Sequence, residues 1–310
     1  MRIGVVLPIA HDDWLSEAPS YSAIRKIALG AEAAGFDSIW VYDHLLFRFP
    51  DEPTVGIHEV WTILAAIAEA TDRVELGTLV MCTEFRNPAL LAKMAATLDH
   101  VSGGRLILGI GCGWHDPEYE AFGYPTDHKV GRFEDSLTII RSLIREGRAD
   151  HAGVYHSARE AVLLPPARPD LPILIAAKRP RMLELTARHA DQWNMAWFGE
   201  PSERLATTRA DLAAACATVG RDPSTLGITV GITVRYPDLI PASSTGDGGH
   251  ADVETPALTG DADAVAAGLR HHAELGADHA IIALEPTTPE ALARLTAAMD
   301  RFRATPVSAG

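Results

Sequence analysis

The fold of this chain is indicated most directly by AAGFDSIW, residues 33–40. Small residues end a helical stretch, a turn follows, and an acidic residue then leads into a run of β-forming side chains. The same order recurs as ARHADQWN at 187–194 and as ELGADHAI at 274–281. A helix cap followed by a turn back into a sheet is what a repeated helix–strand unit requires. The three joints therefore predict an α/β chain built from repeated units.

Apolar runs alternate with helical periodicity along nearly the whole chain, and the runs are continuous, as in parallel strands buried on both faces. We expect strands at 3–9, 38–42, 74–82, 106–111, 173–177, 192–197, 227–236 and 279–284, with helices such as 23–34, 60–70, 88–101 and 133–146 between them. Eight units predict a single (β/α)8 TIM barrel over 1–303, followed by a short tail at 304–310. A doubly wound sheet is the alternative, but the glycine fingerprint expected after its first strand is missing.

Composition excludes several classes of function. The 310 residues carry a formal net charge of −14, and no basic run offers the cationic surface that nucleic acid requires. The N-terminal MRIGVVLPIA is too short and too soon interrupted to be a membrane span or a signal peptide. Three scattered cysteines imply no disulfide framework, and no CxxC or HExxH pattern suggests a metal site. We therefore expect a cytoplasmic protein without a metal centre, membrane contact or nucleic-acid partner.

In a barrel of this kind the chemistry lies at the C-terminal ends of the strands. Those ends are polar here: Asp43, His44, Thr83, Glu84, Arg86, Lys178, Arg179, Arg235 and Glu285. Long segments at 45–56, 114–126 and 238–260 follow strands as well, and the last of these is an insertion after the seventh strand. Its Gly, Ser, Thr and Asp content predicts a mobile surface loop or flap. These features predict a pocket on one rim.

The stretch RLILGIGCGWHDPEYEAF, residues 105–122, runs from a strand into alternating glycines. Gly109, Gly111 and Gly113 lack a β-carbon, so a flat ligand can approach the backbone closely. The same spacing also occurs in plain strand-to-helix turns, and it is not the GxGxxG fingerprint. Glu118 and Tyr119 are expected in the first turn of the helix that follows.

Four segments together resemble the luciferase-like monooxygenase superfamily over roughly residues 1–300. They are WVYDH at 40–44, GTLVMCTEFRNPALLAKMAATLDHVSGGRL at 77–106, GIGCGWHDPEYEAFG at 109–123 and PILIAAKRPRMLELTARHADQWN at 172–194. The WVYDH strand end is more similar to the branch that uses the deazaflavin coenzyme F420 than to the branch that uses FMN.

The resemblance implies roles for individual residues around the cofactor. His44 would be the catalytic acid or base beside the reactive ring, next to Asp43, and histidine suits this because its ordinary pKa is close to neutral. The alternative is a histidine hydrogen-bonded to Asp43 that only holds the loop. A non-prolyl cis peptide is expected at Leu79–Val80 or its neighbour. Leu79, Val80 and Cys82 would line the ring, although Cys82 is equally readable as a small core residue.

Further positions concern the rest of the cofactor and the substrate. Gly111, Cys112 and Gly113 match the loop that runs along the cofactor. Ala176, Ala177, Lys178 and Arg179 match a phosphate-binding turn at a helix start, to which Arg181 would add charge; a solvated helix start is the alternative. Trp14, Trp114, Phe122 and Trp197 suggest a substrate with a hydrophobic or aromatic body. Sugar-phosphate dehydrogenases of the deazaflavin branch have a carboxylate where this chain has Trp114, which argues against that activity.

These matches imply an oxidoreductase that transfers a hydride between coenzyme F420 and a small organic substrate. One alternative keeps the fold and uses FMN and dioxygen in a monooxygenase. A second alternative is a barrel that binds a flavin without turnover, because fold alone does not fix function. The substrate, the direction of transfer and the oligomeric state, a homo-oligomer included, are left open by the sequence.

Overall fold

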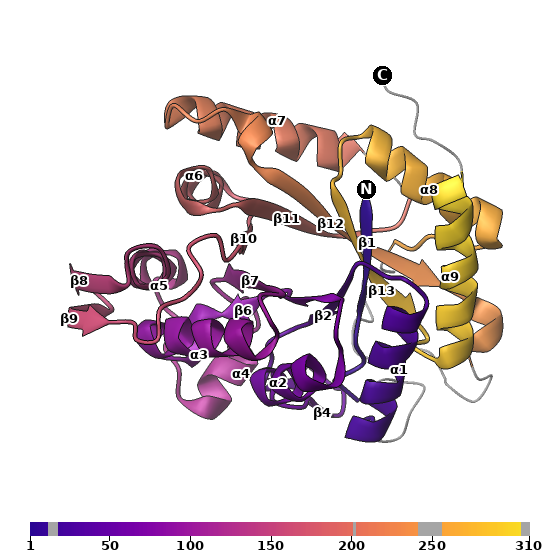
Figure 1. Cartoon of the computed structure of the whole chain (residues 1–310), viewed down its shortest axis with the longest axis horizontal. Helices are drawn as coiled ribbons and strands as arrows, with labels where there is room; N and C mark the ends of the chain where they lie inside the picture. Colours follow the sequence, from indigo (N-terminus) through magenta and orange to yellow (C-terminus); the bar gives the residue numbers. More distant parts are fainter. Residues whose placement is uncertain (12–17, 201–202, 241–255, 305–310) are drawn as a thin grey trace.

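The computed structural model describes residues 1–11, 18–200, 203–240 and 256–304, and in this part of the chain parallel strands form a closed barrel surrounded by helices (Figure 1). The eight barrel strands are β1 (Arg2–Val6), β2 (Ser38–Val41), β5 (Glu75–Thr78), β7 (Leu106–Gly111), β10 (Ile173–Ala176), β11 (Gln192–Phe198), β12 (Gly227–Arg235) and β13 (His279–Glu285). They follow one another around the ring, and β10 pairs with β7 while β1 pairs with β13, which closes it. The predicted (β/α)8 barrel is confirmed.

A helix follows each barrel strand. In chain order these helices are α1 (Tyr21–Ala33), α2 (Val60–Ala70), α3 (Pro88–Val101), α5 (Lys129–Glu146), α6 (Pro180–His189), α7 (Glu203–Thr218), α8 (Ala262–Glu274) and α9 (Pro289–Ala304), with the short α4 (Asp116–Phe122) before α5. The predicted joint geometry is present after α8, where Gly276 has φ 84°. A residue with a β-carbon would be strained there, so glycine is what lets the chain turn back into β13.

Several short elements lie outside this repeat. They are the hairpin β3 (Leu46–Phe47) and β4 (Val55–Gly56), the hairpin β8 (Arg148–Ala152) and β9 (Ser157–Val162), β6 (Met81–Cys82), and the 3₁₀ turns η1 (Thr83–Phe85), η2 (Pro223–Thr225) and η3 (Pro237–Leu239). The predicted third strand, 74–82, is divided into β5 and β6, with Leu79 and Val80 between them. Most of the predicted flap, 241–255 of 238–260, and the tail beyond Ala304 lie outside the described residues.

Apolar side chains fill the barrel interior as well as the space between strands and helices. Inside the barrel, Trp40 packs in one cluster with Val6, Ile107, Leu174 and Ile281. This layer closes the barrel below the C-terminal ends of its strands, so a cavity at those ends would have this layer as its floor. No helix within the described ranges is long and apolar enough to cross a membrane.

A buried histidine lies at the opposite, N-terminal end of the strands. His279 is fully buried; its Nε2 shares a hydrogen bond with Ser38 Oγ at 2.7 Å, and Trp40 Nε1 donates to the same oxygen at 2.7 Å. Burial, with a smaller contribution from Arg2, lowers the pKa of His279 from 6.5 to about 3. The imidazole is therefore neutral in the folded protein at ordinary pH.

Because His279 is buried in its neutral form, we predict that the protein becomes less stable in acid. Between pH 6.5 and pH 3 the unfolded chain binds a proton at His279 that the folded chain does not bind, so the free energy of unfolding falls as the pH falls through this window. The expected slope from this group is about 1.4 kcal/mol per pH unit. Urea unfolding at pH 6, 5 and 4 should show it, and His279→Gln should remove that part of the slope. Equal slopes in both proteins would contradict the prediction.

Candidate active site

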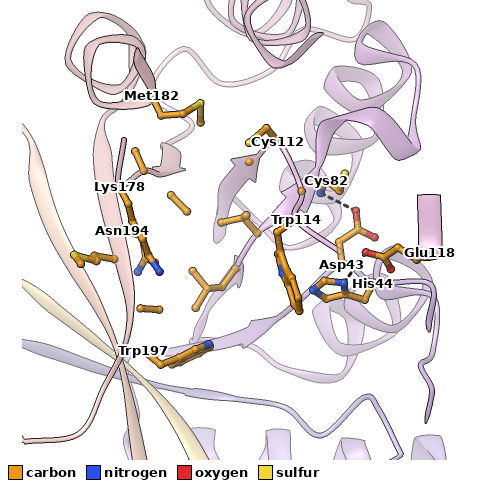
Figure 2. A pocket seen from close by; sticks show the side chains of 18 of the residues that line it. Asp43, His44, Cys82, Cys112, Trp114, Glu118, Lys178, Met182, Asn194 and Trp197 are labelled. Carbon is orange, nitrogen blue, oxygen red and sulfur yellow. Dashed lines mark hydrogen bonds and ion pairs between the residues drawn. The ribbon is translucent and has the colours of Figure 1, made fainter. Parts of the chain in front are cut away.

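A cavity of about 1070 Å³ opens at the C-terminal ends of the barrel strands. Its lining includes every position predicted to hold the cofactor: Asp43, Leu79, Val80, Cys82, Gly111, Cys112, Gly113, Ala176, Ala177, Lys178 and Arg179. His44, Trp114 and Trp197 line it too. Figure 2 shows Lys178, Asn194 and Trp197 on one side of the cavity and Asp43, His44 and Glu118 on the other. The strand order brings together residues that lie more than 150 positions apart in the sequence.

His44 follows β2 and is held by a carboxylate from α4. Its Nδ1 and Glu118 Oε1 are 2.8 Å apart, and the backbone N–H of Leu45 donates to Glu118 Oε2 at 2.7 Å. Glu118 is fully buried, and each of its carboxylate oxygens has one of these two partners. The other imidazole nitrogen, Nε2, has no hydrogen-bond partner among the described residues and lies on the cavity side of the ring (Figure 2). The pair therefore leaves one ring nitrogen of His44 facing the cavity.

The hydrogen bond between His44 and Asp43 that the loop-holding alternative requires is not formed: His44 binds Glu118, and Asp43 binds Arg86. Asp43 Oδ2 accepts from Arg86 Nη1 at 2.6 Å and from the backbone N–H of Cys82 at 2.9 Å, while Oδ1 accepts from Arg86 Nη2 at 3.2 Å. Burial raises the pKa of the Asp43 carboxyl, and the Arg86 guanidinium opposes this by favouring the charged form. Arg86 also binds Glu59, the residue that caps α2, at 2.7 Å. Asp43 is thus a buried anchor of the cavity wall.

The glycine segment after β7 is fixed by Tyr119. Tyr119 Oη donates to the carbonyl oxygen of Cys112 at 2.9 Å and lies 2.9 Å from Cys82 Sγ. Gly113 has φ 69°, and a β-carbon there would come within 1.8 Å of the tyrosine oxygen. Burial raises the pKa of the Cys82 thiol to about 12, so it stays protonated as part of the wall. Glu118 and Tyr119 lie in the first turns of α4, as expected.

The floor of the cavity is apolar. Leu79, Val80 and Trp197 pack against the cluster around Trp40 that closes the barrel. The cis peptide expected at Leu79–Val80 is present, and a second non-prolyl cis peptide joins Ala196 to Trp197. Flat apolar walls of this kind suit a planar ring system.

Positive charge gathers at one end of the cavity. Lys178 and Arg179 lie between β10 and α6, and Arg204 reaches in from α7, where it donates to the carbonyl oxygen of Trp197 at 2.5 Å. Within the described ranges no carboxylate pairs with any of these three cations. Partial desolvation lowers the pKa of Lys178, and the charge of Arg204 acts in the same direction. In a chain of net charge −14, three cations for which the described residues provide no counter-charge favour an anionic ligand group.

The start of α6 adds to this anion-binding character. Arg179 occupies the N-cap position, but its side chain makes no capping hydrogen bond, so the first-turn N–H groups remain available. The expected contribution of Arg181 is not found. Arg181 Nη2 is paired with Glu134 at 2.5 Å, and Arg181 is not part of the cavity lining.

Aromatic rings line the entrance on the His44 side. Trp114 is 57% exposed, stacks on Phe47 at 6.2 Å between ring centroids, and meets His44 edge-on at 5.5 Å. Of the other predicted substrate contacts, Trp197 lies in the floor, Phe122 is exposed at the end of α4 away from the lining, and Trp14 lies outside the described residues.

The cavity fits a flavin or deazaflavin in size and chemistry. It offers an apolar floor for a ring, a cationic end for a phosphate, and a protonatable nitrogen opposite that end. Sequence reasoning missed four of the groups involved: Glu118 as the partner of His44, Arg86 as the partner of Asp43, and the lining residues Asn194 and Arg204. Across the described ranges, no group of three or more His, Cys, Asp or Glu side chains is arranged to hold a metal ion.

The cationic end supports a prediction on ligand affinity. Replacing both Lys178 and Arg179 with alanine should raise the Kd of a phosphate-bearing cofactor by about 10- to 100-fold, because charge-assisted hydrogen bonds are lost. The melting temperature should change little, since these side chains are exposed. Arg181→Ala is the matched control and should leave the Kd unchanged. An unaltered Kd in the double variant would place the phosphate elsewhere.

Comparison with known proteins identifies the family of this chain. Residues 1–238 match the model for the luciferase-like monooxygenase family. The pyrimidine monooxygenase RutA of Rhizobium rhizogenes is 31% identical over 243 residues, 72% of this chain and 65% of that protein. A phthiodiolone/phenolphthiodiolone dimycocerosates ketoreductase of Mycobacterium sp. (strain JLS) is 37% identical over 222 residues, 64% of this chain and 57% of that protein. The matched segments thus span between 57% and 65% of the length of these two relatives.

Solved structures show the same fold. An F420-dependent secondary alcohol dehydrogenase, determined with an F420–acetone adduct, aligns with a TM-score of 0.80 and 20% identity over 97% of this chain and 99% of that chain. At this identity the likeness concerns the fold. The family match over residues 1–238 leads to one conclusion: the chain belongs to the luciferase-like monooxygenase family.

Proposed function

We propose that this enzyme transfers a hydride between coenzyme F420 and a small organic substrate with a hydrophobic or aromatic body. The observation that carries the proposal is the His44–Glu118 pair, which offers Nε2 to a cavity that also has an apolar floor and a cationic end. One relative is named a ketoreductase and one structural neighbour is named an F420-dependent secondary alcohol dehydrogenase. Both names describe hydride transfer, which supports this choice.

Some residues of the cavity would bind the cofactor, and His44 would transfer a proton. Lys178, Arg179 and Arg204 would hold the phosphate, and Leu79 with Val80 would support one face of the ring. A bound deazaflavin supplies the carbon that donates or accepts the hydride. These residues would hold the cofactor between the cationic end and the β2 side of the barrel mouth.

His44 would move the proton that accompanies the hydride. When substrate is reduced, the hydride goes to an electrophilic carbon and the imidazolium Nε2–H donates its proton to the adjoining heteroatom; in the oxidising direction neutral Nε2 accepts that proton. Glu118 keeps Nδ1 engaged in both states and stabilises the imidazolium. Trp114, at the entrance beside His44, would pack against the substrate's apolar body.

A flavin-dependent monooxygenase is the second candidate. The observation in its favour is the 31% identity to a relative named pyrimidine monooxygenase. An enzyme of this kind would use the same cavity, with FMN and dioxygen in place of the deazaflavin.

Fluorescence titration of the ligand-free protein with F420 and, separately, with FMN tests the choice. We expect saturable binding of F420 in the micromolar range and binding of FMN at least about tenfold weaker. Tighter binding of FMN would favour the monooxygenase. Absence of binding by both would overturn the proposal.

A further inference from the structure

Asn194 is a buried polar residue of the cavity that the mechanism above leaves unused. It lies on β11, is 1% exposed, and lines the cavity between Lys178 and Trp197 (Figure 2). Polar side chains buried to this degree normally have their hydrogen-bonding groups satisfied. The hydrogen bonds of Asn194 therefore show which of its polar atoms still needs a partner.

The neighbouring Thr229 fixes the orientation of the Asn194 amide. Thr229 Oγ1 donates its hydrogen to the carbonyl oxygen of Trp193 at 3.0 Å, so it can only accept from the amide. Asn194 Nδ2 is the group that donates to it, at 2.8 Å. This leaves Oδ1 pointing away from Thr229, and no described residue donates to Oδ1. The cavity thus contains a fixed, unused acceptor.

The position of this acceptor indicates which part of a cofactor it meets. Asn194 pairs with Ala176 of β10, and its carbonyl oxygen accepts from the N–H of Ala177 at 3.2 Å, immediately before Lys178 and Arg179. In the ring of strands, β11 lies four places from β2, which carries His44. With the reactive ring beside His44 and the phosphate at the cationic end, the chain that joins them would pass within reach of Asn194.

We propose that Asn194 Oδ1 accepts a hydrogen bond from a hydroxyl group of the polyol chain that joins the cofactor ring to its phosphate. The inference rests on the proposed function only in requiring a flavin or deazaflavin in the cavity, since both carry such a chain. Asn194 would then select hydroxylated cofactors and fix the distance between ring and phosphate.

The test is a thermodynamic cycle measured as Kd by fluorescence titration. The two probes are the cofactor that the wild-type protein binds, F420 or FMN, and its deoxy analogue, in which a pentyl phosphate chain replaces the polyol phosphate. The proteins are wild type, Asn194→Leu, and the control Thr229→Val, which removes the Asn194–Thr229 bond but keeps Oδ1. Thermal unfolding checks that each variant is folded at the assay temperature, and Asn194→Ala replaces the leucine variant if that one is not.

Wild type should bind the hydroxylated cofactor more tightly than its deoxy analogue. Asn194→Leu should reduce this ratio of Kd values by about tenfold, the change expected from the loss of one hydrogen bond to a buried acceptor. Thr229→Val keeps Oδ1 but releases the amide that Thr229 orients, so it should reduce the preference by less than Asn194→Leu does. A preference unchanged by Asn194→Leu, or an equal loss of affinity for both probes, would overturn the inference while leaving the proposed function standing. Failure of wild type to bind either F420 or FMN would overturn both.

Discussion

Replacing His44 with alanine should lower kcat by about 10²–10⁴ while the Kd of the cofactor changes by less than about threefold. A group that moves a proton acts in the transition state, whereas a wall of the cavity contributes to binding before and after the reaction. Steady-state turnover and fluorescence titration on the same preparation separate the two. Near-normal turnover would remove the proton-transfer role from His44 and direct attention to the segment around Trp114.

Glu118→Gln is the companion variant. The amide keeps a hydrogen-bonding group beside His44 but removes the negative charge that would stabilise positive charge on the imidazole in the transition state, so kcat should fall by about 10- to 100-fold. Because the amide can still accept from the N–H of Leu45, the Kd of the cofactor should change by less than about threefold. An unchanged kcat would show that the carboxylate has no electrostatic role.

Removing the guanidinium of Arg86 should give the largest loss of stability. Arg86→Met leaves the buried Asp43 carboxylate without its cation, and breaking a buried ion pair in this way costs about 3–5 kcal/mol. Urea unfolding at pH 8 measures the loss. Adding Asp43→Asn to Arg86→Met should recover part of it, because a neutral amide is less costly to bury.

The chain contains a matched control for this experiment. Arg188 and Glu184 form an exposed pair one helical turn apart on α6, at 2.7 Å, so Arg188→Met should cost no more than about 0.5 kcal/mol. If Arg86→Met cost as little, the Asp43–Arg86 pair would contribute no more than a surface pair does.

The barrel could be predicted because its signals are local. A helix end, a turn and the next apolar strand occupy eight adjacent residues at each joint, and the strands 106–111 and 192–197 agree with β7 and β11 to within a residue at each end. The third strand was predicted as one element because its apolar run is continuous through Leu79 and Val80. Its division into β5 and β6 depends on backbone geometry that residue type does not encode.

The partners within the site could not be predicted, because they are set by packing between distant segments. Asp43 precedes His44 directly, yet the carboxylate that binds the imidazole comes from Glu118, 74 positions away. Arg181 resembles Lys178 in sequence context, but α5 places Glu134 beside it. Likewise, a net charge of −14 conceals the local excess of cations at one end of the cavity.

The double attachment of Glu118 also bears on how such enzymes can be re-engineered. Because its two carboxylate oxygens bind His44 and Leu45 separately, the short helix after β7 and the loop after β2 form one mechanical unit. A loop graft meant to alter substrate range by exchanging residues 114–126 would transplant half of that unit. A graft that keeps a glutamate at position 118 would keep the carboxylate that holds His44. A graft that shifts this glutamate by one residue would turn the carboxylate to another face of the helix.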